Sequence, residues 1–109
     1  SDLLEVWRGE HAVAEDADIV INGTSIGLYD GGARLPIALE SLRPGMVAAD
    51  VVFNPVQTRF LIEAASRGCI PLDGLGMLVN QGVVGIQYWT GIDPDPAVMR
   101  RALESAMGV

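Results

Sequence analysis

Three short segments of the sequence place glycines, hydroxyls and amide side chains directly after apolar runs. They are residues 22–27 (Asn-Gly-Thr-Ser-Ile-Gly), 50–55 (Asp-Val-Val-Phe-Asn-Pro) and 73–81 (Asp-Gly-Leu-Gly-Met-Leu-Val-Asn-Gln). Glycine lets backbone amides approach a ligand closely, and an amide such as that of Gln81 both donates and accepts hydrogen bonds. Together the segments indicate a site for a small polar molecule. The structural alternatives are a plain turn at 22–27, local pairing of Asp50, and a Gln81 amide bonded to the backbone.

The third segment only partly matches a dinucleotide fingerprint. Gly74 and Gly76 follow a predicted strand and open a predicted helix, but Val79 stands at the position of the third glycine. The acidic residue expected about 20 residues further on, at the end of a strand, is also missing, because Asp93 and Asp95 lie beside prolines. We therefore expect nucleotide phosphates to be bound by a part of the protein that this chain does not contain.

The composition of the chain excludes several classes of partner and of catalytic chemistry. The chain has 109 residues, half of them apolar, which is enough for one compact domain with a core. All seven basic residues are Arg, against fourteen acidic ones, and this net charge of −7 argues against nucleic acid and anionic membranes as partners. The absence of Lys excludes a Schiff base or a P-loop lysine on this chain.

The single His11 and single Cys69 exclude a metal cluster and a disulfide framework on the chain. Cys69 is expected to be inert packing, and His11 a solvated surface group. No apolar run approaches 18 residues, so the sequence predicts no membrane span and is typical of a soluble, cytoplasmic protein. The chain begins at Ser1 without an initiator Met, and we expect it to be a piece of a longer protein.

The elements that position the three segments form an alternating pattern. Strands are predicted at 18–22, 46–53 and 69–72, with a short helix at 36–42, a second from Thr58 to a stop at Gly68, and a long one at 77–89. The run Ile19-Val20-Ile21 suits a strand covered on both faces. Asp95 and Pro96 predict the start of a last helix that buries Val98, Leu103 and Met107. Met77 and Trp89 are expected in the core.

Alternating strands and helices predict the α/β class, with parallel strands joined by right-handed crossovers. Three strands make the second half of a Rossmann-like doubly wound sheet, followed by C-terminal helices. Such a half leaves one sheet edge and one helix face uncovered, so the chain could self-associate as a homodimer.

Residues 17–27, 50–58 and 73–82, taken in this order, resemble the back half of the shikimate dehydrogenase family, which includes quinate/shikimate dehydrogenases. The predicted helix before Gly68 and the sequence Tyr-Trp-Thr-Gly at 88–91 add to the resemblance, which covers the chain from about residue 16 to its end. It implies part of the NADP-binding domain of a two-domain enzyme that reversibly oxidises shikimate to 3-dehydroshikimate by hydride transfer, on the route to aromatic amino acids.

The resemblance also implies roles for individual residues. The cofactor contacts would come from Asn22, Thr24, Ser25, Val51, Gly74 and Met77. The first three would lie along the ribose and nicotinamide, Val51 and Met77 would contact the nicotinamide ring, and the Gly74 carbonyl would accept from the carboxamide. Gln81 would bind a substrate hydroxyl. Phe53 stands where the family usually has a Tyr facing the substrate, so a different cyclohexene or cyclohexane acid is an alternative substrate.

The family's catalytic Lys and Asp, its substrate-carboxylate site and its glycine-rich phosphate loop belong to the front of the chain, and none is carried over here. We therefore assign no catalytic residue, and expect the 109 residues alone to turn over no substrate. Two other hypotheses stay open: a non-catalytic half-Rossmann module for dimerisation or ligand sensing, and an NAD(P)-dependent enzyme of another family that shares only the sheet pattern.

Overall fold

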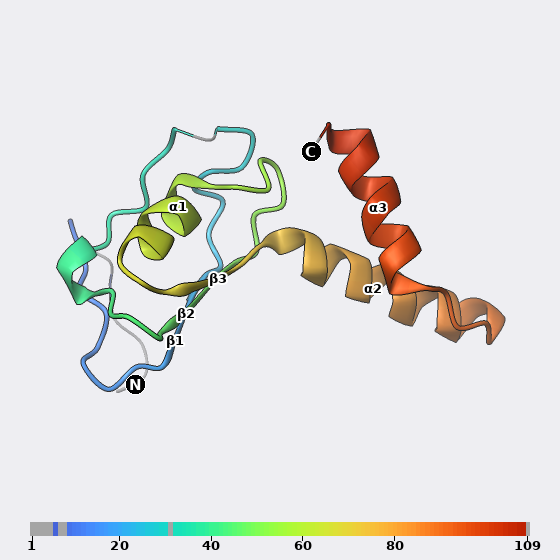
Figure 1. Cartoon of the computed structure of the whole chain (residues 1–109), viewed down its shortest axis with the longest axis horizontal. Coiled ribbons are helices and arrows are strands. Elements are labelled where there is room, and N and C mark those ends of the chain that lie inside the picture. The colour runs from blue at the N-terminus through green and yellow to red at the C-terminus, as the bar shows by residue number, and fades with distance from the viewer. Residues whose placement is uncertain (1–5, 7–8, 31, 109) are drawn as a thin grey trace.

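The computed structural model describes residues 6, 9–30 and 32–108. Its strands are β1 (Ile19–Asn22), β2 (Val47–Asp50) and β3 (Ile70–Leu72), and its α-helices are α1 (Arg59–Ser66), α2 (Gly74–Thr90) and α3 (Pro96–Met107) (Figure 1). The three strands form one parallel sheet in the order β1-β2-β3. The predicted class, an α/β chain with three strands alternating with helices and further helices at the C-terminal end, is confirmed.

Side chains and glycines at the helix ends explain where the helices begin and stop. Thr58 caps α1, its hydroxyl accepting from the Leu61 amide, and Asp95 caps α3 with Pro96 at the first helical position, as predicted. Asp73 caps α2. The helix therefore begins at Gly74, three residues earlier than predicted, because the carboxylate satisfies amides that a turn would have used. Gly91, with φ 72°, ends it in the left-handed conformation that favours glycine.

The core lies between one face of the sheet and α1. Leu42, Ala48, Leu61 and Ala64 are fully or almost fully buried there, with further apolar side chains around them. Cys69 belongs to this core, its Sγ donating to the Arg43 carbonyl oxygen at 3.4 Å. Burial raises the pKa of the Cys69 thiol above its ordinary value, which agrees with the inert packing role predicted from the sequence.

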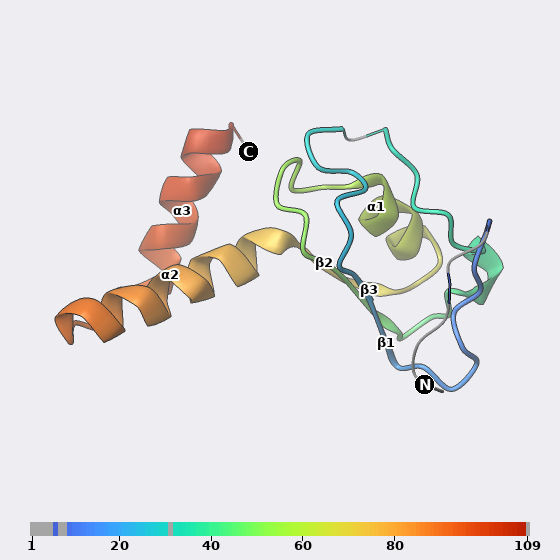
Figure 2. The ribbon, with the colours of Figure 1, turned by 180° about the vertical axis from the view of Figure 1, so that it is seen from behind.

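The opposite face of the sheet is bare in the described part of the chain. Ile21 is 61% exposed, and its neighbours on that face, Ile19, Ile70 and Leu72, are also exposed. The expectation that β1 is covered on both faces is therefore wrong for these residues. The cause is visible in Figures 1 and 2: α1 lies over one face, whereas α2 leaves the end of β3 and runs away from the sheet. The predicted self-association stays a prediction.

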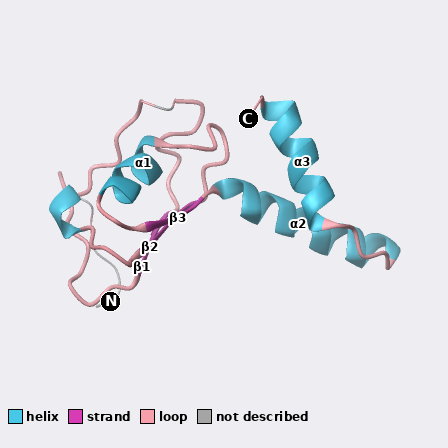
Figure 3. Cartoon of the chain, in the orientation of Figure 1, coloured by secondary structure: helices cyan, strands magenta, loops and turns pink. Residues whose placement is uncertain are grey.

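The helices α2 and α3 project from the sheet, and α3 crosses α2 and then rises away from it (Figure 3). None of the described residues of α3 is fully buried: Val98 is 51% exposed, and Leu103 and Met107 are half-buried. The predicted buried face of the last helix is thus only partly formed. Met77 and Trp89 on α2 are 48% and 80% exposed, so their assignment to the core is also wrong.

The segment before β2 differs from the prediction as well. The helix predicted at 36–42 is reduced to one 3-10 turn, Leu39–Ser41. Its first residues instead bridge to His11, whose amide donates to the Pro36 carbonyl at 2.9 Å and whose carbonyl accepts from the Ala38 amide at 2.9 Å. His11 is therefore half-buried and bonded to its neighbours, not a solvated group. Within the described residues, no helix has the length and apolar character needed to cross a membrane.

Candidate functional site

The three polar segments meet at the end of the sheet where the carboxyl ends of its strands lie. Each follows the carboxyl end of a parallel strand, and the register pairs Asn22 with Asp50 at the ends of β1 and β2. The Val51 amide donates to the Asn22 carbonyl at 3.1 Å. A Cβ on Gly74 would lie 2.5 Å from the Val52 carbonyl oxygen, so the start of α2 lies directly against the loop after β2. Ligands of open α/β sheets bind at this edge.

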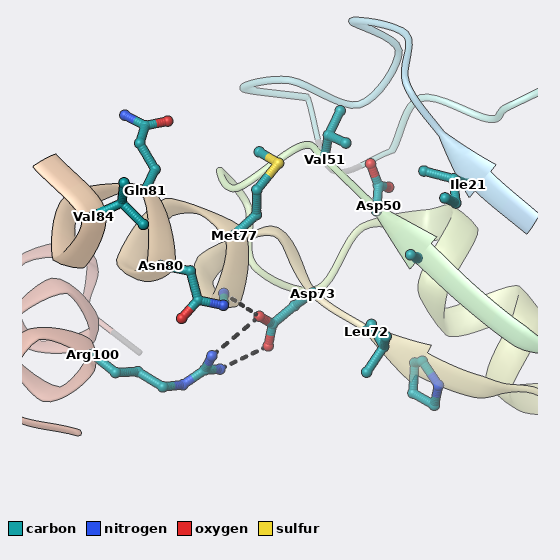
Figure 4. A pocket seen from close by; sticks show the side chains of 13 residues that line it. Ile21, Asp50, Val51, Leu72, Asp73, Met77, Asn80, Gln81, Val84 and Arg100 are labelled. Atoms are coloured by element: carbon teal, nitrogen blue, oxygen red, sulfur yellow. Dashed lines mark hydrogen bonds and ion pairs between the residues drawn. The ribbon is translucent and has the colours of Figure 1, made fainter. Parts of the chain in front are cut away.

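A groove of about 940 Å³ opens beside this edge, between the bare face of the sheet and α2. Its walls are mainly apolar. Figure 4 shows Met77 and Gln81, one helical turn apart, extending from the same side of α2, with Val51 beyond Met77. The polar groups in the lining come from Asp50, Asp73, Asn80, Gln81 and Arg100. Apolar walls with a few polar groups are typical of small-molecule and cofactor sites.

The structure brings three of the eight predicted site residues into this groove: Val51, Met77 and Gln81. Asn22 and Thr24 line a smaller hollow of about 230 Å³ beside β1. The other three, Ser25, Phe53 and Gly74, line neither of these hollows. Asn22 is the last residue of β1 and the other seven follow a strand, so all eight lie toward the carboxyl end of the sheet.

The side chain of Asn22 is buried and fully hydrogen-bonded within the protein. Its Oδ1 accepts from the Thr24 amide at 3.0 Å and from the Thr24 hydroxyl at 2.7 Å. Its Nδ2 donates to Asp50 Oδ1 at 3.1 Å and to the Ile26 carbonyl at 3.3 Å. An amide side chain has two N–H donors and two oxygen lone pairs, and all four are used here. Asn22 therefore shapes the loop at 22–27, and its predicted cofactor contact stays a prediction.

Asp50, which the sequence left open between a local and a functional role, makes three hydrogen bonds within the protein. Its Oδ1 accepts from Asn22 and from the Val52 amide at 2.9 Å, and its Oδ2 accepts from the Thr58 hydroxyl at 2.7 Å. The carboxylate is buried. Local pairing is thus what the structure shows, and Thr58 is a partner that sequence reasoning did not assign.

Two groove residues, Asn80 and Arg100, were not predicted as site residues from the sequence. Arg100 lies 27 residues beyond its partner Asp73, and no local pattern signals such a pairing. Burial by itself would raise the pKa of the Asp73 carboxyl, but the hydrogen bonds and charge of Arg100, with the amides of Gly76 and Leu75, hold it below its ordinary value. Asp73 is therefore a charged partner for Arg100 at neutral pH.

The residues present fit one end of the implied NADP. The apolar side chains of Val51 and Met77 both line the groove and give a flat ring apolar surfaces to lie against. The phosphates are a different matter, because Arg100, the basic side chain in the groove lining, is already paired with Asp73. Among the residues described, the groove thus suits the nicotinamide end of the cofactor.

A family model and the relatives of similar sequence point to the same family. Residues 74–104 match the family model described as Shikimate 5'-dehydrogenase C-terminal domain. The shikimate dehydrogenase (NADP(+)) of Geobacillus kaustophilus is 41% identical over 107 residues, covering 98% of this chain and 38% of the relative. That of Thermococcus kodakarensis is 44% identical over 88 residues, covering 81% of this chain and 32% of the relative. The chain thus spans about a third of the length of these relatives.

Solved structures agree. The ligand-free 5-ketofructose reductase of a Gluconobacter species superimposes with a TM-score of 0.90 at 50% identity, covering 94% of this chain and 37% of that one. The shikimate 5-dehydrogenase of Thermus thermophilus, solved with NADP(H) and shikimate, gives a TM-score of 0.78 at 39% identity, covering 85% and 35%. The resemblance of this chain to the C-terminal part of the shikimate dehydrogenase family is thereby confirmed.

Proposed function

We propose that the chain supplies the nicotinamide-binding edge of an NADP-dependent shikimate dehydrogenase, which transfers a hydride reversibly between shikimate and 3-dehydroshikimate. The observation that carries this proposal is the groove in which Val51, Met77 and Gln81 lie together at the carboxyl ends of parallel strands. Relatives at about 40% identity that are named for this activity support it. In this proposal residues 1–109 are part of the NADP-binding domain, and the reaction takes place in the cytoplasm.

Each residue has a defined task in the proposal. Val51 and Met77 hold the nicotinamide ring between apolar surfaces and exclude water from it. The Gly74 carbonyl accepts from the carboxamide, and Thr24 and Ser25 lie along the ribose. NADP, when bound, accepts or supplies the hydride. Gln81 offers an exposed amide to a substrate hydroxyl, which a site for a polyol acid needs for discrimination.

The proton that leaves the substrate hydroxyl needs a base that this chain does not provide. No Lys is present in the sequence, and the Asp50 carboxylate is occupied by three hydrogen bonds. We therefore place the proton-transfer pair and the phosphate-binding loop in the rest of the full-length protein. The isolated chain is expected to show no turnover.

A second candidate is the reduction of a keto sugar by the same hydride chemistry. It is supported by the 50% identity to a protein named 5-ketofructose reductase. It is also supported by Phe53, since this residue lacks the hydroxyl that the family resemblance would turn toward shikimate. A change of substrate at one position, with the cofactor edge retained, would account for both observations.

The experiment is a substrate comparison on the full-length protein that contains these residues. NADPH oxidation is followed with 3-dehydroshikimate, 3-dehydroquinate and 5-ketofructose at matched concentrations, with the wild type and with Phe53→Tyr. A shikimate dehydrogenase favours 3-dehydroshikimate in kcat/KM, and Phe53→Tyr leaves that preference in place or strengthens it. Preference for 5-ketofructose would select the second candidate. No oxidation of NADPH with any of the three would overturn both.

A further inference from the structure

We propose that Asp50 is a positioning residue, which fixes the conformation of the loop at 23–27 through the Asn22 amide and thereby sets the affinity for the nicotinamide end of the cofactor. The proposal deepens the proposed function and rests on it for the cofactor. Its structural basis is the buried chain of side chains Asn22, Asp50 and Thr58, which joins the ends of β1 and β2 to the start of α1.

The carboxylate of Asp50 dictates which way the Asn22 amide turns. Asp50 Oδ1 also receives the Val52 amide and so acts as an acceptor, which means that the NH2 group of Asn22 must face it. The Asn22 oxygen then points to the other side, where it receives both the amide and the hydroxyl of Thr24. A flipped amide would place the Asn22 oxygen against the oxygens of Asp50 and Ile26, and its NH2 group against the Thr24 N–H. The orientation of Thr24 thus depends on a hydrogen-bond acceptor that lies two hydrogen bonds away.

The loop is held at its other end by the same network. The second N–H of Asn22 donates to the Ile26 carbonyl, and the Thr24 hydroxyl accepts from the Ile26 amide at 3.1 Å. Gly27, at φ 101°, lies against the Thr58 side chain, with the Cγ2 atom 3.8 Å from where a Cβ would be. Thr58 is in turn held by Asp50 and caps α1. Both ends of the loop are therefore fixed by one buried carboxylate.

The hydrogen bonds of Asp50 allow variants that distinguish a role in positioning the loop from a role of its charge. All buried side-chain nitrogen and oxygen atoms among the described residues have hydrogen-bond partners, those of Asn22, Asp50 and Thr58 included. Asparagine at position 50 would still accept from Asn22 and from the Val52 amide, and the Thr58 hydroxyl can rotate to accept from the new NH2 group. Alanine would leave two buried N–H groups without an acceptor. Geometry is kept by Asp50→Asn and lost in Asp50→Ala.

The test uses the full-length protein that contains these residues, labelled with 15N, with two measurements. The first, without cofactor, is the hydrogen exchange of the Asn22 side-chain amide and the Thr24 backbone amide. The second is the dissociation constant for NADP+. The variants are Asp50→Asn, Asp50→Ala, Thr58→Ser and Thr58→Val. Leu42→Ala, in the core away from the loop, is the control for lost stability.

We expect Asp50→Ala and Thr58→Val to speed both exchange rates and to weaken NADP+ binding, each by about tenfold, because a buried donor or acceptor loses its partner. Asp50→Asn and Thr58→Ser should stay within about threefold of the wild type in both measurements. Leu42→Ala should lower the melting temperature while changing neither. If Asp50→Ala does not fold, the comparison of Thr58→Val with Thr58→Ser tests the proposal in the same way.

Two results would overturn the proposal: Asn22 exchange unchanged in Asp50→Ala or Thr58→Val, or Asp50→Asn as defective as Asp50→Ala, which would point to the charge itself. Failure of the proposed function has a different signature. In that case the wild type binds no NADP+, while the exchange measurements still decide whether Asp50 positions the loop.

Discussion

Arg100 on α3 reaches back to the carboxylate of Asp73, with its Nη2 2.8 Å from Oδ2 and its Nη1 3.3 Å from Oδ1 (Figure 4). The same carboxylate caps α2 by accepting from the Leu75 and Gly76 amides at 3.1 and 3.4 Å. One side chain therefore caps the start of α2 and holds α3 to it. Because the groove lies between α2 and the sheet, this pair helps to fix the direction in which its helical wall leaves the sheet.

Replacing Arg100 by Gln should lower the free energy of unfolding by about 1 kcal/mol at neutral pH, since a two-point charged contact is lost from a partly exposed site. Arg101→Gln is the matched control, because it removes the same charge from the exposed neighbouring residue. It should change the free energy by less than about 0.5 kcal/mol. Urea denaturation followed by circular dichroism measures both, and equal losses in the two variants would contradict a specific role for the pair.

The same pair predicts a pH dependence of defined sign. The pKa of Asp73 in the folded chain is below its ordinary value of 3.8, because Arg100 and the helix amides outweigh the effect of burial. A lowered folded pKa gives stability that is fully present above the unfolded value and is lost as the pH falls through the folded value. The stability difference between wild type and Arg100→Gln should therefore be constant above about pH 5 and shrink below about pH 4.

Thermal melts of the two proteins across this range measure the difference. Glu104, whose Oε2 lies 3.7 Å from Arg100 Nε, is a second acidic partner that Arg100→Gln also loses. A difference that stays unchanged down to about pH 2 would show that Arg100 stabilises the contact between α2 and α3 by packing its side chain, and not by its charge.

Two glycines on α2 should differ in how much stability is lost when each is replaced by alanine. Gly74→Ala places a Cβ 2.5 Å from the Val52 carbonyl oxygen, which is backbone and cannot move aside, so the expected loss is about 1–3 kcal/mol. Gly82→Ala meets only the end of the Met99 side chain at 2.8 Å, which can turn away, and it gains helix propensity. Its net effect should lie within about 0.5 kcal/mol of zero. Denaturant unfolding of both variants tests the contrast.

The sequence was sufficient for those features that neighbouring residues determine. The caps Thr58 and Asp95, the three strands and the common edge of the three polar segments were all predicted, because each depends on a few consecutive residues. Contacts between distant segments could not be predicted: Asn22 with Asp50 is 28 residues apart, and Asp73 with Arg100 is 27. The predictions of which side chains are buried failed for the same reason. The apolar pattern of β1 and α2 shows which faces tend to be covered, but not what covers them.

The substrate role proposed for Gln81 is tested in the full-length protein with the substrate that the comparison above selects. The Gln81 amide is exposed and lines the groove, and in the described part of the chain no hydrogen bond to its side chain is recorded, so it is available to a ligand. Gln81→Ala removes one neutral hydrogen bond, worth about 0.5–1.5 kcal/mol, which corresponds to roughly a three- to tenfold rise in the KM of the substrate. The KM of NADP should change less.

Asn80→Ala is the matched control for this prediction. Asn80 is also an exposed amide in the groove lining, but Figure 4 shows it on the side of α2 that faces Asp73 and Arg100, whereas Gln81 extends away from them. The control should therefore leave the KM of the substrate within about twofold of the wild type. Equal increases in the KM of substrate and of NADP for Gln81→Ala would remove Gln81 from the substrate site. Because neighbouring residues on one helix turn present their side chains in different directions, the pair separates a contact with substrate from a general disturbance of α2.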